Sequence, residues 1–420
     1  MNSFYASCER LFRPELRTKP VVVLSNNDGC IVALTKDAKK LGFKRGTPYF
    51  KARPALEHYG VAVCSSNYEL YQSVSDRIAR ILDDMVPEME RYSIDEVFCD
   101  LTGMEGDLTA FGASVRARIG RWVGIPCCVG IAPTKTLAKL CDHFAKTFPV
   151  FGGVVNWCEL TEARRRKALS ITDVKEVWGV GGKTAEKLAA MGVKTALDFY
   201  ELPSAWVRQR FNVVLERTHR ELHGLSCMPL EPTPKQRLQI CRSRSFGELS
   251  RTIEDVEAAI AAHVGEAASQ MRRDGLKARR LTVFFGTDFF REDLEQDWVE
   301  VPVDLGRATA DTLLLTKAAL TVVKVRWKAS CRYKKAGVIL SGFVEEGALA
   351  EAGSLFDAPG ADAEVERREN LMKTMDQLNA RYGRGTIQCV AAKLSDGWLM
   401  KRDHLSRCCL TRLEDMLKVG

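Results

Sequence analysis

Six segments between residues 238 and 343 alternate in an order that few folds accommodate. Runs rich in β-branched and aromatic residues predict four strands, at residues 238–246, 281–285, 298–303 and 337–343. Apolar positions at helical spacing predict two helices between these strands, at residues 253–271 and 310–323. The first helix is capped at Thr252 and stops at Gly275. This order predicts a βαββαβ domain whose basic segments line the face or edge of a sheet.

The N-terminal part of the chain carries another alternation of strands and helices. Two strands and four helices are expected there, the strands at residues 20–24 and 126–131 and the helices at residues 31–41, 67–85, 108–123 and 134–146. A hairpin starts at Pro87, between the second and third of these helices. The order suits a split βαβ layer with one face covered by helices, and the hairpin would sit at its centre.

That hairpin carries two adjacent carboxylates, Asp95 and Glu96, flanked by apolar residues within the ten-residue stretch from Arg91 to Asp100. On a regular strand their side chains would point to opposite faces and could not share a ligand. If the chain turns there, both carboxylates meet at a tip, where a bound cation would relieve their repulsion. A solvated acidic turn is the alternative, and the pair alone does not decide between them.

Composition bounds the class of protein. A length of 420 residues fits roughly three domains, and the net charge of +8 permits a polyanionic partner. Basic residues cluster at 164–167, 272–280 and 324–335, which favours nucleic acid. No apolar run reaches 18 residues and no signal peptide is expected, so a membrane partner is excluded. The 14 cysteines lack C-x-x-C spacing, which predicts reduced thiols in a cytoplasmic protein.

Residues 176–202 differ in character from the rest. The run from Gly179 to Thr184 imitates the end of a phosphate-binding P-loop, but Val177 stands where that motif needs its first glycine. Two short helices joined through Gly192 remain, with a glycine turn ahead of them. Backbone N–H groups at such a turn can hold a DNA phosphate, as in a helix-hairpin-helix. An ordinary pair of helices is the alternative.

Several motifs together resemble the Y-family DNA polymerases. They are the run from Asn2 to Glu9, the hairpin at 92–96, the Gly130–Lys139 motif, the helix-hairpin-helix and the separate βαββαβ domain. Further runs at residues 26–30, 65–71 and 211–217 are similar to the UmuC-like members of that family. The resemblance covers essentially the whole chain.

The resemblance implies an α+β fold shaped as a right hand, with a ferredoxin-like βαββαβ palm and a helical thumb. The expected palm is 1–12 with 74–165, the small fingers 13–73, the helix-hairpin-helix thumb 166–230 and the little finger 236–345. A flexible tether would follow at 346–370 and a helical C-terminal docking segment at 371–420. The implied activity is error-prone translesion DNA synthesis in the SOS response.

The resemblance also implies roles for individual residues. Two Mg²⁺ ions about 4 Å apart would be held by Asp95, Glu96 and the backbone carbonyl of Met1. Tyr5 matches the aromatic steric gate that excludes a ribose 2′-OH. The incoming triphosphate would be bound by Lys146, Lys39 and Phe4, although Lys36 replaces a tyrosine that often assists Lys39.

One departure from the family pattern concerns the metal site. The pattern Asp-Val-Asn-Ser-Phe-Tyr places a third metal ligand, an Asp, one position ahead of Met1. A miscalled start is our hypothesis, with the protein beginning a few residues upstream. The alternative is a truncated, catalytically inactive DNA-binding homologue. The codons directly ahead of Met1 decide between the two.

Further sites and partners are expected beyond the catalytic centre. The residues expected to contact DNA are Gly179, Gly181, Gly182, Lys183, Arg244, Arg279, Arg280, Arg332 and Lys334. Ser354, Leu355 and Phe356 resemble the end of a sliding-clamp peptide. The alternative is that these apolar residues occur in the linker by chance. The partners implied are primer-template DNA with dNTPs, a cleaved UmuD dimer, a recombinase filament and the clamp. His219 and His223 lack a third metal ligand and are expected to be surface residues or packing residues of the thumb.

Overall fold

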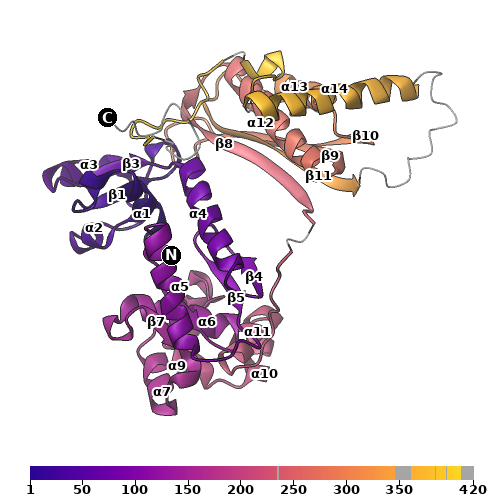
Figure 1. Ribbon diagram of the computed structural model, residues 1–420. Coiled ribbons are helices and arrows are strands. Elements are labelled where there is room, and N and C mark those ends of the chain that lie inside the picture. Colours follow the sequence, from indigo (N-terminus) through magenta and orange to yellow (C-terminus); the bar gives the residue numbers. More distant parts are fainter. Residues whose placement is uncertain (234–235, 346–360, 384, 394, 408–420) are drawn as a thin grey trace. The chain divides into compact units, whose positions relative to one another are not determined.

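The computed structural model describes residues 1–233, 236–345, 361–383, 385–393 and 395–407 (Figure 1). The chain forms two compact units. The first contains the described residues of 1–25, 30–234 and 404–420, and the second those of 26–29 and 235–403. Within the described residues no helix is both long enough and apolar enough to cross a membrane. Every cysteine in them is a free thiol, as expected.

A three-stranded sheet forms the N-terminal corner of the first unit, in the order β2-β1-β3. Its strands are β1 (Val21–Leu24), β2 (Ile31–Leu34) and β3 (Ala62–Ser65), with helices α2 (Lys36–Lys40) and α3 (Tyr49–His58). The helix expected at 31–41 is therefore wrong in its first half. Ile31 and Val32 are β-branched and pair with β1, and α2 starts only after Thr35, whose side chain accepts a hydrogen bond from the Ala38 N–H.

Helices and two small sheets make the centre of the same unit. The helices are α1 (Phe4–Leu11), α4 (Tyr68–Asp83), α5 (Leu108–Trp122) and α6 (Lys135–Thr147). The strands β4 (Glu88–Arg91) and β5 (Val97–Asp100) are antiparallel, whereas β6 (Val129–Ile131) and β7 (Val154–Asn156) are parallel. Gly130 is required on β6, because a Cβ there would lie 2.2 Å from the Ala138 carbonyl oxygen of α6.

The two small sheets are not joined in one ladder, although a single palm layer was expected. The chain's first residues lie between them. The Met1 amino group donates to the Asp95 carbonyl (2.7 Å), and the Asn2 N–H donates to the Pro126 carbonyl (2.9 Å). Backbone hydrogen bonds from Met1 and Asn2 thus bridge the hairpin and the segment that leads into β6.

A cluster of short helices completes the first unit. They are α7 (Glu162–Ser170), α8 (Gly182–Ala190), α9 (Ala196–Tyr200), α10 (Ser204–Arg210) and α11 (Val213–Leu222). His219 is buried, with its ring 5.4 Å from the Phe199 ring and 4.7 Å from the His223 ring. His219 thus packs within this cluster, whereas the exposed His223 stacks on the Tyr200 ring, which agrees with the expectation of surface or packing residues.

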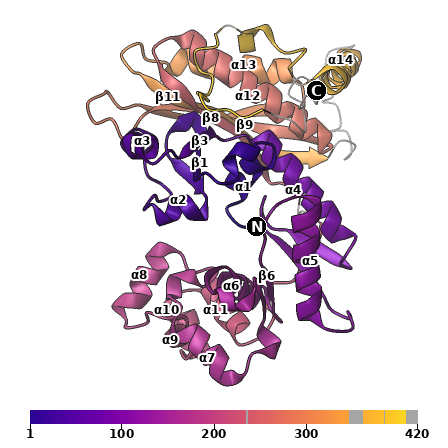
Figure 2. The same cartoon turned by 60° about the vertical axis from the view of Figure 1, so that its left-hand side comes forward.

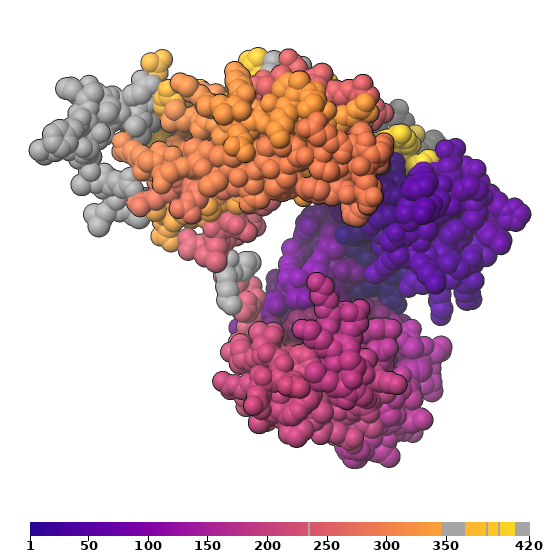
Figure 3. Space-filling model, turned by 180° about the vertical axis from the view of Figure 1, so that it is seen from behind, coloured from indigo at the N-terminus to yellow at the C-terminus, as the bar shows by residue number. Residues whose placement is uncertain are grey.

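The second unit is built on one antiparallel sheet, in the order β10-β9-β11-β8. Its elements in chain order are β8 (Gln239–Ser250), α12 (Ile253–Arg273), β9 (Leu276–Thr287), β10 (Trp298–Thr309), α13 (Thr312–Arg326) and β11 (Tyr333–Glu345). Helices α12 and α13 cover one face (Figure 2). This is the expected βαββαβ order. The residues of β10, α13 and β11, orange in Figure 3, form a continuous surface of this unit.

A further helix, α14 (Ala361–Tyr382), docks on the second unit. Arg272 binds the Asp376 carboxylate with two hydrogen bonds (2.7 and 2.8 Å), Lys277 contacts Glu369 (2.6 Å), and Met372 is buried. The flexible tether expected at 346–370 is thus wrong from Ala361 onward, because this Ala- and Glu-rich stretch is a strong helix former. Residues 398–407, expected to be helical, contain no helix.

Candidate active site

The two carboxylates stand in a turn. Strands β4 and β5 pair up to Arg91 and Val97, which leaves residues 92–96 as the connecting loop. The Ser93 N–H donates to the Glu96 carbonyl (3.1 Å), and the Ser93 hydroxyl donates to a carboxylate oxygen of Asp95 (3.1 Å). Asp95 and Glu96 are both half-buried. The loop is therefore a structured one, and the regular strand that would have separated the two side chains is not formed.

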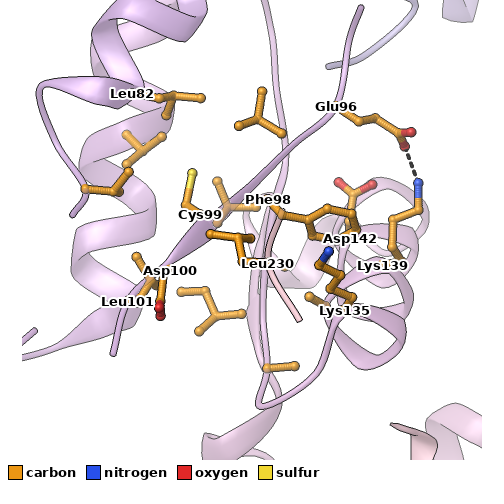
Figure 4. A pocket seen from close by; sticks show the side chains of 18 of the residues that line it. Leu82, Glu96, Phe98, Cys99, Asp100, Leu101, Lys135, Lys139, Asp142 and Leu230 are labelled. Carbon is orange, nitrogen blue, oxygen red and sulfur yellow. Dashed lines mark hydrogen bonds and ion pairs between the residues drawn. The ribbon is translucent and has the colours of Figure 1, made fainter. Parts of the chain in front are cut away.

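A lysine from a distant helix neutralises one of the carboxylates. The Lys139 ammonium of α6 lies 2.7 Å from Glu96 and 4.9 Å from the centre of the Tyr92 ring (Figure 4). Burial alone raises the pKa of Glu96, but the Lys139 hydrogen bond and the charges of Lys139 and Lys146 outweigh it. The pKa of Glu96 consequently lies below its ordinary value, and the side chain is held as a carboxylate.

Helix α6 presents further charges beside this pair. Lys146 forms an ion pair with Asp142 at 2.5 Å. Burial alone lowers the pKa of Lys146, and the carboxylates of Asp142 and Glu96 more than reverse this, so the pKa is raised. Lys135 contacts Glu90 and donates to the Pro229 carbonyl (2.8 Å). Lys135, Lys139 and Asp142 line the same cavity, of about 670 Å³, as Asp95 and Glu96 (Figure 4).

Lys135, Lys139 and Asp142 were not among the residues predicted to form the site. Their positions at i, i+4 and i+7 on one helix were a usable signal, because that spacing places side chains on one face. What the sequence could not supply was the partner, since Glu96 is 43 residues away in the chain from Lys139.

Aromatic rings form a second part of the site. The Tyr5 ring stacks on Tyr71, with centroids 4.5 Å apart and planes at 13°, and meets the edge of Tyr68 at 5.9 Å. Burial, and then the charges of Tyr68 and Asp95, raises the pKa of the Tyr5 hydroxyl. The neighbouring Phe4 side chain is buried in the core, so only its backbone is available to a triphosphate. Lys39 lies exposed on α2.

The donor set suits a hard cation. Asp95 and Glu96 offer carboxylate oxygens, the ligand type that Mg²⁺ prefers. Among the described residues no group of three Asp, Glu, His or Cys side chains comes together as a metal cage. The two carboxylates of Asp95 and Glu96 fit a hard divalent cation such as Mg²⁺.

The glycine turn opens helix α8. Gly179 has a φ of +92°, and a Cβ there would lie 2.7 Å from the Thr218 hydroxyl, so only glycine fits. Gly181 is the N-cap and Gly182 the first helical residue, with no side chain capping the turn. Lys183 is exposed beside these backbone N–H groups. Such an uncapped helix N-terminus can receive a phosphate oxygen.

The basic residues expected to contact DNA in the second unit divide between the two faces of its sheet. Arg244 pairs with Ala336, a core residue beneath the helices, so Arg244 lies on the helix-covered face. Arg280 pairs with Ser341 on the opposite, open face. Arg279 is exposed on β9, and Arg332 lies directly ahead of β11. Lys334 donates to the Phe246 carbonyl (2.7 Å), and burial lowers its pKa.

The open face carries residues that the sequence analysis did not select. The rings of Phe284 and Trp298 stack at 5.9 Å, and the Lys335 ammonium lies 5.8 Å from the Phe284 ring centre. Strand alternation at 284 and 298 was the available signal, but the face that α12 covers could not be told from sequence alone.

Ser354, Leu355 and Phe356, the residues expected to form the clamp peptide, lie outside the described residues.

Comparison with known proteins identifies the family. Models described as the impB/mucB/samB family and its C-terminal domain match residues 1–143 and 237–353, and a domain of unknown function (DUF4113) matches residues 369–419. Protein UmuC of Salmonella typhimurium is 42% identical over 424 residues, which is 100% of this chain and 98% of that protein. The chain belongs to the impB/mucB/samB family.

Other members and solved structures agree with this assignment. Protein MucB of Escherichia coli is 41% identical over 97% of this chain and 95% of its own length. DNA polymerase IV of Caulobacter vibrioides is 28% identical over 92% of this chain and 91% of its own length. A chimera of the Y-family DNA polymerases Dbh and Dpo4 superposes with a TM-score of 0.63 at 22% identity, over 82% of this chain and 97% of that one. The impB/mucB/samB chain has the fold of the Y-family DNA polymerases.

Proposed function

We propose that this family member is a DNA-directed DNA polymerase that performs error-prone translesion synthesis in the SOS response. One observation carries the proposal. The Asp95–Glu96 turn, the lysine-bearing face of α6 and the Tyr5 ring are brought together in one unit from segments far apart in the chain. A site made of paired carboxylates, ammonium groups and an aromatic wall suits nucleotidyl transfer from a triphosphate.

In the proposed mechanism each group of residues has a separate task. Asp95 and Glu96 would hold Mg²⁺ through their carboxylate oxygens. The metal, when bound, would supply activation of the primer 3′-OH and charge compensation for the triphosphate. Lys146 contacts the triphosphate oxygens, and Lys139 balances the charge of Glu96. The Tyr5 ring occupies the space that a ribose 2′-OH would need, so that deoxynucleotides are selected.

In this proposal, residues outside the catalytic site bind the DNA backbone. The α8 N-terminus takes a backbone phosphate of the duplex without reading its sequence. Arg279, Arg280 and Arg332 supply further phosphate contacts from the second unit. The proposed partners beyond DNA and dNTPs are a cleaved UmuD dimer, a recombinase filament and the sliding clamp, with the protein acting in the cytoplasm. Clamp binding that survives Leu355→Ala with Phe356→Ala would remove the clamp peptide from this proposal.

Primer extension with Mg²⁺ tests the function. The templates are undamaged or carry one abasic site, and the wild type is compared with Asp95→Ala. We expect the wild type to insert a nucleotide opposite the abasic site and continue past it, and Asp95→Ala to add none. DNA binding by both proteins, with no nucleotide added by either, would support the non-catalytic DNA-binding function instead.

A further inference from the structure

A buried carboxylate links the Tyr5 ring to the C-terminal segment. Glu9 lies one helical turn after Tyr5 on α1 and is 1% exposed. Its Oε1 accepts two hydrogen bonds, from the Tyr71 hydroxyl (2.6 Å) and from the Ser406 hydroxyl (3.1 Å). Tyr71 is itself fully buried, and its ring is the surface on which Tyr5 stacks. One oxygen of Glu9 therefore fixes the hydroxyl end of the ring that supports Tyr5.

Ser406 is held from a second direction by Asn67. The Asn67 amide donates both to the Ser406 carbonyl (3.1 Å) and to the Ser406 hydroxyl (3.0 Å). The Asn67 side-chain oxygen accepts the Leu70 N–H (3.2 Å) and so caps α4, the helix that carries Tyr71. Ser406 thus contacts both supports of Tyr71, its hydroxyl partner and the start of its helix.

The same segment is anchored two residues earlier. The His404 N–H donates to the Ser65 hydroxyl (3.0 Å), and the Ser65 N–H donates to the His404 carbonyl (2.9 Å). The His404 ring contacts the Tyr49 hydroxyl (3.2 Å). Ser65 ends β3 and stands two residues ahead of Asn67. Residues 404–406 therefore follow the β3–α4 connection, and their position is set by several hydrogen bonds.

We propose that Ser406 is a positioning residue for the steric gate, through which the C-terminal segment sets how strictly the enzyme excludes ribonucleotides. The inference rests on the proposed polymerase function and on Tyr5 as the wall of the nucleotide pocket. Ser406 and Tyr71 share one acceptor oxygen. Loss of the Ser406 hydroxyl frees Glu9 and the Tyr71 ring to shift, and Tyr5, which stacks on that ring with nearly parallel planes, shifts with it.

The test measures sugar selectivity, the ratio of kcat/KM for a dNTP to kcat/KM for the matching rNTP, on an undamaged primer-template. Ser406→Ala is expected to lower this ratio by roughly 3- to 10-fold, the value of one hydrogen bond to a buried acceptor. Ser406→Thr, which keeps the hydroxyl, is expected to retain the ratio. Leu405→Ala, an uncharged change at the exposed neighbouring residue, is the matched control and is expected to leave the ratio unchanged.

A second background isolates the route through Tyr5. In Tyr5→Ala the wall is already absent, so adding Ser406→Ala is expected to change the ratio no further. An unchanged ratio in Ser406→Ala, or an equal fall when it is added to Tyr5→Ala, would overturn the inference while the polymerase function stands. If no form incorporates any nucleotide, the proposed function fails, and the inference fails with it. Thermal unfolding of Ser406→Ala, alongside Ser406→Thr, separates a shifted ring from a misfolded chain.

Discussion

Glu96 and Glu9 belong to the same unit, and their surroundings move their pKa values in opposite directions. Glu96 stands half-buried at the hairpin, where Lys139 and Lys146 lower its pKa against the effect of burial. Glu9 is enclosed among neutral donors, where burial raises its pKa although Tyr71 and Ser406 hydrogen-bond to it. The Glu96 side chain at the cation site is thus kept charged and half-buried. The Glu9 side chain, behind the aromatic ring of Tyr71, serves as a fixed hydrogen-bond acceptor.

The aromatic wall can be removed without touching the charged hairpin. Tyr5→Ala is expected to raise rNTP incorporation about 10²-fold relative to dNTP incorporation, because the ring that would clash with a 2′-OH is gone. Single-nucleotide kinetics with matched dNTP and rNTP measure the effect. Extension with dNTPs should persist, and Phe at the same position is the control that keeps the ring. If Tyr5→Ala discriminates between dNTP and rNTP as well as the wild type does, a residue other than Tyr5 excludes the 2′-OH.

The charged hairpin can be weakened while the wall is kept. Lys139→Met is expected to reduce kcat/KM for dNTPs about 10-fold, since Glu96 loses its charge partner. Because Lys139 holds the pKa of Glu96 down, its loss moves that pKa upward, and the acid limb of the pH–rate profile shifts to higher pH.

The exposed Lys51→Met changes the net charge by the same amount and serves as the control. Sugar selectivity should stay unchanged in Lys139→Met, in contrast to Tyr5→Ala. An acid limb that does not move would mean that the protonation of Glu96 does not govern the rate.

The buried glutamate should affect stability rather than rate. A raised pKa in the folded chain means that the unfolded chain ionises first as the pH rises, so Glu9 weakens the fold progressively above the ordinary pKa of a glutamate. The loss is at most about 1.4 kcal/mol per pH unit while the folded chain stays protonated. Glu9→Gln keeps an acceptor for Tyr71 and Ser406 and removes the titration.

Urea unfolding at several pH values from 5 to 8 would compare the two chains, and Glu186→Gln, a change at an exposed glutamate, is the control. The free energy of unfolding of Glu9→Gln should increase relative to that of the wild type as the pH rises. A constant difference between the two would show that Glu9 is ionised in both states.

Local patterns predicted much of the fold. The helix at 108–123 and the six elements of the second unit follow apolar spacing, and the structure contains all of them, although β9 starts five residues earlier and β10 ends six residues later than expected. The helix expected at 31–41 failed because Ile31 and Val32 find pairing partners in β1, which local spacing does not reveal. The tether expected at 346–370 failed where Ala361 begins a helix that salt bridges hold to α12 and β9.

The candidate site was only partly visible in the sequence. Asp95, Glu96 and Tyr5 were selected from motifs, and the structure brings them near one another. The ion pair of Glu96 with Lys139 and the hydrogen bond of Glu9 with Ser406 join segments 43 and 397 residues apart. Such contacts depend on the packing of whole elements, and no local pattern specifies them. For the same reason the irregular, non-helical course of residues 398–407 was not predicted.

The central claim is that Asp95 and Glu96 hold the catalytic cation. Its most direct test is the Mg²⁺ dependence of single-nucleotide incorporation by the wild type, Asp95→Asn and Glu96→Gln. Both variants keep the side-chain shape and lose one negative charge. We predict that kcat falls at least 10²-fold in each, with a higher Mg²⁺ requirement for what remains, while DNA affinity and the melting temperature stay near wild type. Wild-type rates in both variants at the same Mg²⁺ concentration would contradict the account.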